Sequence, residues 1–377
     1  MGRGRYIYQI ADKEPIRSCV ANTYLANVRN KGNLDVLKNT LVSKLIIKHK
    51  TVIGVELIRE CGTKIKAYAR KEVVLSAGAF NTPQILLLSG IGPKPELEKL
   101  GIPVVLDSPK VGKNLQDHVH VPVAVVGGPS QATTLENAVS MLDWKTFPLP
   151  MVGSLFNVNK DPKKQSPEIQ TITLNFGAAS PFFYYLCHIT FNFNHTVCKS
   201  FFNDTLAKEV YYTLTILNNP LSRGEVTLRS TDIKDPPVIN AGFFRNKADL
   251  ITLSKGVKKV YELLTECYEK VGGSFSRPPL PQCDDLEFGC DDYWLCYTRI
   301  MSSTTYHPAG TCAMGPDGVT DSDLKVRGIK NLRVVDASVI PKLPTANIEP
   351  TVIMIAEYAA DKIKKEYACE DETAADC

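Results

Sequence analysis

The segment Glu72–Pro93 constrains the fold of this chain most, because it predicts a strand, a turn and a helix in direct succession. Residues 73–75 (Val-Val-Leu) are consecutively apolar, which is typical of a fully buried strand in a parallel sheet. The small residues at 76–78 (Ser-Ala-Gly) end that strand, and Asn-Thr-Pro at 81–83 predicts a helix start, since proline is favoured in a first turn. A strand, a small-residue turn and a helix in this order form half of a nucleotide-type crossover.

Periodicity elsewhere predicts a mixture of strands and helices, so the expected fold class is α/β with α+β character. Residues 247–266 place leucine and valine on one side of an amphipathic helix. Residues 119–200 show weak periodicity and many prolines and aromatics, and this stretch is expected to be irregular. The expected strands are 34–37, 41–47, 52–58, 65–68, 73–75, 210–217 and 225–228.

Length and charge exclude several functional classes. The 377 residues are enough for two or three domains with a large core. The net charge is only +4, from 44 basic and 40 acidic residues that are interspersed, so no nucleic-acid partner is expected. Apolar runs are far shorter than the roughly 20 residues that span a bilayer, so no transmembrane segment is expected.

The eleven cysteines include no C-x-x-C pair, and Cys283, Cys290 and Cys296 lack metal-ligand spacing, so no metal site is expected. We favour mostly buried thiols, with a secreted protein carrying one or two disulfides as the alternative. Asn194-His-Thr and Asn203-Asp-Thr match the glycosylation pattern, although such triplets are common by chance. No signal peptide is expected in these residues, and the compartment stays open, a secreted full-length form included.

Two polar residues in the last quarter of the chain are candidates for an active site. His307 lies in Tyr-His-Pro-Ala-Gly, where proline and glycine predict an irregular turn, and Asn347 precedes a helix expected from Pro350. A polar pair held in this way can bind an alcohol and take its proton. The structural alternatives are a histidine that caps its own turn and an asparagine that caps the helix.

Five blocks of this sequence resemble, in order, the motifs of the glucose–methanol–choline (GMC) flavoprotein oxidoreductases. They are 76–92, 112–118, 222–230, 306–315 and 332–361, and the resemblance extends from about residue 17 to 367. Within the family the chain looks most like the group of insect glucose dehydrogenases and ecdysone oxidases. The resemblance implies a partial FAD-binding Rossmann-like domain and a substrate domain whose antiparallel sheet is covered by helices.

The resemblance also implies domain boundaries. Residues 1–122 would form a partial FAD-binding domain and 123–317 the substrate-binding domain. Residues 318–369 would return to the FAD-binding domain, and 370–377 would be a flexible tail.

The activity implied by the resemblance is the oxidation of a CH–OH group with FAD as the cofactor. His307 would be the general base that takes the hydroxyl proton while hydride passes to flavin N5, a task suited to a histidine pKa of about 6.5. Asn347 would donate a hydrogen bond to the substrate oxygen. The substrate would be a small-molecule alcohol of sugar or sterol type, and the electron acceptor, quinone or oxygen, stays open.

The remaining site residues are also carried over from the family's motifs. Asp336 and Ala337 would contact the ribityl and phosphate region, and Ala77 and Gly78 would line the flavin cleft. The helix start at Pro350 and Thr351 would direct a positive dipole end at the flavin pyrimidine. Val42 would meet the adenine, although simple packing explains a valine there nearly as well.

The sequence departs from the family's pattern at one place that matters. The G-x-G-x-x-G turn that binds a dinucleotide pyrophosphate is absent from the 377 residues. We therefore interpret the chain as an N-terminally truncated member, with a fragmentary gene model favoured over a partial clone or a degenerate paralogue. The alternatives are a non-catalytic remnant that cannot hold FAD alone, acting as a binding protein, and a lyase that keeps the flavin.

Overall fold

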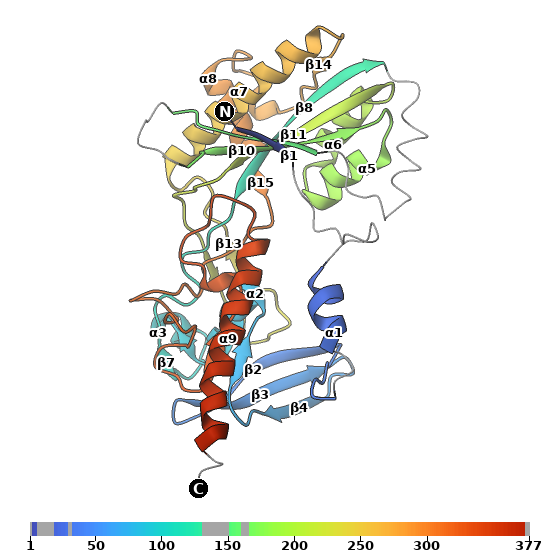
Figure 1. Cartoon of the computed structure of the whole chain (residues 1–377). Helices are drawn as coiled ribbons and strands as arrows, with labels where there is room; N and C mark the ends of the chain where they lie inside the picture. The colour runs from blue at the N-terminus through green and yellow to red at the C-terminus, as the bar shows by residue number, and fades with distance from the viewer. Residues whose placement is uncertain (1, 6–18, 29–31, 130–150, 160–165, 374–377) are drawn as a thin grey trace. The chain divides into compact units, whose positions relative to one another are not determined.

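The computed structural model describes residues 2–5, 19–28, 32–129, 151–159 and 166–373. The chain divides into two compact units, and Figure 1 labels their helices and strands and colours the chain by residue number. Unit 1 comprises Met1–Val36, His118–Asn218 and Asn246–Thr305, and unit 2 comprises Leu37–Asp117, Asn219–Arg245 and Tyr306–Cys377.

Unit 1 is built on an antiparallel sheet with the strand order β1-β9-β10-β11-β8-β14, and β15 also pairs with β8. The strands are β1 (Gly2–Arg5), β8 (Val119–Pro129), β9 (Met151–Phe156), β10 (Ile169–Phe176), β11 (Lys208–Leu217), β14 (Ser274–Phe275) and β15 (Ser303–Thr304). The helical elements are η1 (Ala21–Leu25), α1 (Ala26–Val28), α5 (Pro181–Tyr185), η2 (Leu186–Thr190), α6 (His195–Asp204), α7 (Lys247–Glu269), η3 (Pro281–Cys283) and α8 (Asp291–Ile300).

Helices cover both faces of this sheet. Tyr211 of β11 stacks on Tyr268 of α7, whereas the next residue, Tyr212, packs against Phe183 of α5 and Phe201 of α6. Because successive side chains of a strand point to opposite faces, α7 lies on one face and α5 with α6 on the other. This confirms the expected antiparallel sheet covered by helices.

The expectation of an irregular stretch from 119 to 200 is wrong for its described residues. The strand β8 runs through it, and residues 119–126 are all buried. A strand covered on both faces has no apolar–polar alternation, and its Pro122 further weakens the pattern. The periodicity was therefore weak although the structure is regular.

Two disulfides join elements of unit 1, which contradicts the favoured reading of mostly buried thiols. Cys187 of η2 pairs with Cys198 of α6, and Cys283 of η3 pairs with Cys296 of α8. Among the described free cysteines only Cys312 is buried. The alternative of one or two disulfides therefore holds for the described part of the chain.

Unit 2 contains four small sheets around one apolar core. The strands β2-β3-β4 and β12-β13 are antiparallel, whereas β5 pairs with β16 and β6 with β7 in parallel. The strands are β2 (Thr40–Lys48), β3 (Thr51–Arg59), β4 (Lys64–Tyr68), β5 (Val73–Leu75), β6 (Ile91–Gly92), β7 (Leu106–Asp107), β12 (Glu225–Thr227), β13 (Val238–Asn240) and β16 (Leu332–Val334). The helices are α2 (Gly78–Leu88), α3 (Lys94–Lys99), η4 (Ala337–Val339) and α9 (Glu349–Thr373).

The strand–turn–helix expected from the opening segment is present, with two differences. The strand β5 is parallel as expected, but Val74 is 41% exposed, so the strand is not fully buried. The helix α2 begins at Gly78, which places Pro83 in its interior. Proline removes the N–H that would bond the carbonyl of Ala79 four residues back, and the Thr311 hydroxyl donates to that carbonyl instead at 2.7 Å.

The helix α9 is longer than expected and reaches Thr373, past residue 370 where a tail was expected. Residues 374–377 of that tail lie outside the described residues. The last turns, Ala-Cys-Glu-Asp-Glu-Thr after Tyr367, contain alanine and glutamate, which favour continued helix. The helix packs through Ile355 and Ala359 against the core of unit 2.

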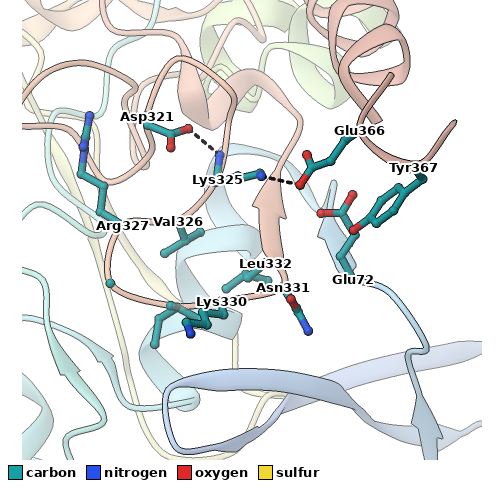
Figure 2. Close-up of a pocket in the computed structure, with 12 residues that line it drawn as sticks. Glu72, Asp321, Lys325, Val326, Arg327, Lys330, Asn331, Leu332, Glu366 and Tyr367 are labelled. Atoms are coloured by element: carbon teal, nitrogen blue, oxygen red, sulfur yellow. Dashed lines mark hydrogen bonds and ion pairs between the residues drawn. The ribbon is translucent and has the colours of Figure 1, made fainter. Parts of the chain in front are cut away.

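A buried arginine ties α9 to the parallel strand pair. Arg333 of β16 is 0% exposed, and its Nε donates to Glu72 at 2.9 and 3.1 Å while its guanidinium also pairs with Glu366 of α9. Lys325 pairs with the same Glu366 at 2.6 Å. Figure 2 shows Glu72, Lys325 and Glu366 at a cavity of about 470 Å³ beside the amino ends of β5 and β16.

The unit bounds differ from the expected domain bounds. Residues 219–245 and 306–317, expected in the substrate-binding domain, belong to unit 2. Residues 1–36 and 118–122, expected in the FAD-binding domain, belong to unit 1. The reason is visible in the backbone hydrogen bonds, because Gly224 pairs with Leu115 and Ala309 pairs with Gln116. Residues 34–37, expected as a strand, are irregular and exposed. No helix in the described part of the chain is long and apolar enough to cross a bilayer.

Candidate active site

The carboxyl ends of the parallel strands β5 and β16 bring four of the expected site residues together in unit 2. The Val335 N–H donates to the Leu75 carbonyl at 2.8 Å, which aligns the two strand ends. Beyond this bond the chain continues into Ala77-Gly78 on one side and Asp336-Ala337 on the other. This edge is where α/β folds hold cofactors, so the crossover predicted from the sequence positions the candidate site.

Asp336 connects the two strand ends directly. Its Oδ2 accepts from the Gly78 N–H at 2.9 Å and from the Thr82 hydroxyl at 2.6 Å. Its Oδ1 accepts from the Ser338 N–H at 2.8 Å, and the residue is only 6% exposed. The bonds to Gly78 and Thr82 fix the start of α2. Each carboxylate oxygen has two lone pairs, so Asp336 can also accept a hydrogen bond from a ligand hydroxyl.

Gly78 leaves open space at the start of α2. Its φ is +81°, and a side-chain Cβ built there would meet no atom within 4 Å. A positive φ favours glycine, and the missing side chain lets a flat ligand approach the backbone. Ala77 beside it is half-buried, and its N–H donates to the Thr82 hydroxyl at 3.0 Å.

His307 lies on an irregular segment, as expected, and the segment is held from both sides. The His307 N–H donates to Asp117 Oδ1 at 3.0 Å, and the preceding Tyr306 has a φ of 62°. Ala309 exchanges two backbone hydrogen bonds with Gln116, both of 2.9 Å. The backbone of His307 is therefore fixed, and the residue is half-buried.

The loop 112–117 connects the His307 segment to the segment that leads to Asn347. The Gln116 side chain donates from Nε2 to the Pro341 carbonyl at 3.1 Å and accepts from the Leu343 N–H at 3.2 Å. Asn114 donates from Nδ2 to the Gly310 carbonyl at 3.2 Å. One loop therefore sets the backbone positions of both candidate segments.

Asn347 is exposed and lies two residues before α9. The helix begins at Glu349, one residue earlier than expected, so Asn347 is not at its N-cap position. Within the described residues its side chain makes no hydrogen bond, which leaves its amide available to a ligand. Pro350 is exposed and Thr351 half-buried in the first turn of this helix.

Of the remaining expected residues, Ala337 contacts the His307 segment, whereas Val42 has only a packing role within the described residues. The Ala337 carbonyl accepts from the Gly310 N–H at 3.1 Å, which links the cofactor edge to the His307 segment. Val42 of β2 is half-buried and packs against the core of unit 2, so the packing alternative is satisfied there. The cavity in Figure 2 contains none of the nine expected site residues.

Sequence reasoning missed the supporting residues Thr82, Asn114, Gln116 and Asp117. All four lie in blocks that carried the family resemblance, but their partners are 190 to 254 residues distant in the hydrogen bonds that matter. Cys312, close by in the sequence, is a poor nucleophile because burial, and secondarily Asp336, raises the pKa of its thiol.

Known proteins are similar to this chain along most of its length. Two family models described as GMC oxidoreductase match residues 2–120 and 220–356. The chain is 34% identical to ecdysone oxidase of Bombyx mori over 98% of this chain and 55% of the relative. It is 33% identical to glucose dehydrogenase [FAD, quinone] of Drosophila melanogaster over 97% of this chain and 59% of the relative.

Among solved structures, formate oxidase of Aspergillus oryzae RIB40 superimposes with a TM-score of 0.73 at 28% identity, covering 90% of this chain and 62% of that one. The chain spans between 55% and 59% of the length of the two curated relatives. The two family models, the relatives and the structural neighbour agree on one assignment: the chain belongs to the GMC oxidoreductase family.

Proposed function

We propose that these residues form the catalytic part of an FAD-dependent oxidoreductase that acts on the CH–OH group of a small-molecule alcohol. The observation that carries the proposal is the loop 112–117, which fixes both the His307 segment and the segment leading to Asn347 in the unit that holds Asp336 and Gly78. A half-buried histidine, an exposed asparagine and an open glycine at a strand edge suit oxidation of an alcohol beside a flat cofactor.

The residues present fit one part of FAD. The open space at Gly78 and the carboxylate of Asp336 suit a flat ring and a hydroxylated chain. The start of α9 would supply N–H groups and a positive dipole end to bound FAD. The pyrophosphate-binding glycine turn is absent from the 377 residues, so FAD retention requires a segment that supplies it.

The roles of the residues follow from their chemistry. Bound FAD would supply the acceptor for the hydride that leaves the alcohol carbon. The His307 imidazole takes the hydroxyl proton at a ring nitrogen, and the Asn347 amide donates a hydrogen bond to the substrate oxygen. Asp117 keeps the backbone of His307 in place but does not contact its reacting atoms through this bond.

The experiment that tests the proposed function uses a version of the chain that binds FAD, extended where needed by the N-terminal region of a relative. Anaerobic addition of sugar, sterol and small primary alcohols should bleach the flavin for at least one class. The matched methyl ethers, which lack the hydroxyl proton, should not. No bleaching by any alcohol, with the flavin bound, would refute the proposal.

The second candidate is a polypeptide without catalysis, which the absent glycine turn favours for these residues alone. The 377 residues on their own should emerge from gel filtration without FAD, because they lack the glycine turn that binds the pyrophosphate. Flavin absorbance near one equivalent per chain would contradict this expectation. The same measurement on the extended version distinguishes a missing glycine turn, which the extension restores, from a site that has lost its affinity for FAD.

A further inference from the structure

The segment Pro181–Thr205 of unit 1, called here the stapled segment, has features that the proposed oxidation does not use. It contains α5, η2 and α6, and the disulfide Cys187–Cys198 closes it on itself. Both Asn-x-Thr triplets of the sequence analysis, at Asn194 and Asn203, lie in it. Two acceptor triplets and a disulfide therefore coincide in one segment of unit 1.

Both acceptor asparagines are exposed, and the fold explains why. Asn194 is the N-cap of α6, and its Oδ1 accepts from the Thr196 N–H at 2.8 Å. Thr196, Lys199 and Asn203 follow the spacing i, i+3, i+7 and are all exposed, so they form the outer face of α6.

The opposite face of α6 is buried in the core of unit 1. Val197, Cys198 and Phe201 are its buried residues, with Cys198 in the disulfide and Phe201 packed against Tyr212. A bulky group on Asn194 or Asn203 would extend into solvent and leave this packing unchanged.

The disulfides supply an independent observation about compartment. Cys187–Cys198 and Cys283–Cys296 lie in different parts of unit 1, and both have fully buried members. Disulfides of this kind form in oxidising compartments, which are also where N-glycosylation takes place. Chance matches to Asn-x-Thr carry no such association with disulfides.

We propose that Asn194 and Asn203 are N-glycosylation sites and that unit 1 matures in the secretory pathway. The Asn Nδ2 forms a bond to the anomeric carbon of an oligosaccharide and loses one proton. The bond from that carbon to a lipid pyrophosphate carrier breaks, and the lipid pyrophosphate leaves. No electrons are exchanged, so the modification needs only the carrier-linked oligosaccharide.

The glycans have a physical use at this position. Tyr185, Ile189 and Leu206 are 54%, 55% and 56% exposed, and all three lie within or next to the stapled segment. Large exposed apolar side chains favour self-association, and a hydrated oligosaccharide nearby opposes it.

The test expresses the full 377-residue chain behind a cleavable secretory leader in insect cells. The chains retained in the secretory compartments and those released into the medium are pooled and digested to peptides. An amidase then removes the N-glycans and converts each glycosylated Asn to Asp. Mass spectrometry should then find Asp at both positions. Scoring retained and secreted chains together means that poor export does not hide the result.

A matched pair of variants separates the modification from the helix cap. Thr196→Ala breaks the triplet but keeps the backbone N–H that Asn194 accepts from, whereas Thr196→Ser keeps both. The first should remove one glycan and the second none, and Asn203→Gln should remove the other. Unmodified Asn at either position in most wild-type molecules, or a glycan that survives Thr196→Ala, would overturn the proposal.

Discussion

The Thr82 hydroxyl should contribute strongly to the stability of unit 2 because it holds the cofactor edge together. Thr82 is 0% exposed; its hydroxyl donates to Asp336 at 2.6 Å and accepts from the Ala77 N–H at 3.0 Å. Valine has nearly the same shape but no hydroxyl, so Thr82→Val removes both bonds without opening a cavity. A bond to a charged group contributes about 1.5–3 kcal/mol and a neutral one about 0.5–1.5 kcal/mol.

The expected cost of Thr82→Val is therefore about 2–4 kcal/mol in the opening free energy of α2. Tryptophan fluorescence is unsuitable for this measurement, because neither tryptophan of the sequence, at positions 144 and 294, belongs to unit 2. Native-state hydrogen exchange read by mass spectrometry of α2 peptides reports unit 2 separately. The two units need not unfold together, so a single global transition is not assumed.

Thr82→Ser is the matched control, since it keeps the hydroxyl and loses one methyl group. It should cost about 1 kcal/mol or less, within the range of a small core truncation. Equal protection of α2 in the Val and Ser variants would refute the reasoning. It would mean that Asp336 is held well enough by the Gly78 and Ser338 N–H groups alone.

Two further perturbations test the electrostatics of each unit. Burial lowers the pKa of His120 to about 3, below its unfolded value of about 6.5, so stability is full above pH 6.5 and declines as the pH falls toward 3. Because of His120, the free energy of unfolding of unit 1 should fall by about 2 kcal/mol between pH 7 and pH 5, as measured by urea unfolding. His120→Leu should abolish this part of the fall, and a fall equal to that of the wild type would contradict the prediction. Arg333→Met should destabilise unit 2 by about 3–5 kcal/mol, because Glu72, with a side chain only 9% exposed, loses its partner. Exchange protection of β16 equal to the wild type would contradict that prediction, and Lys330→Met at the same cavity is the surface control.

The local order of elements could be predicted from the sequence wherever one face of an element is buried. The strand β3 and the helix α7 show such one-sided patterns, and the structure confirms them. The strand β8 could not be predicted, because residues 119–126 are buried on both faces and contain a proline. The pairing of the disulfides could not be predicted either, since eleven cysteines permit many pairings.

The candidate site residues could be named from the sequence, and their roles stay predictions, whereas the contacts that support them could not be named. His307 and Asn347 follow from their turn and helix context together with the family resemblance. The Asp117 carboxylate that holds the His307 backbone lies 190 residues earlier in the chain, and no local pattern marks that pairing. The role of Asp336 in fixing the start of α2 is likewise a contact over 258 residues, to Gly78.

The central claim is that His307 takes the proton of the alcohol. The direct test is the rate at which an alcohol bleaches the flavin, anaerobically, in an FAD-binding version of the chain and its His307→Ala variant. A general base contributes about 10²–10⁴-fold, so the variant should keep its flavin and react at least about 10²-fold more slowly. A bleaching rate within about threefold of the wild type, with flavin content unchanged, would contradict the account.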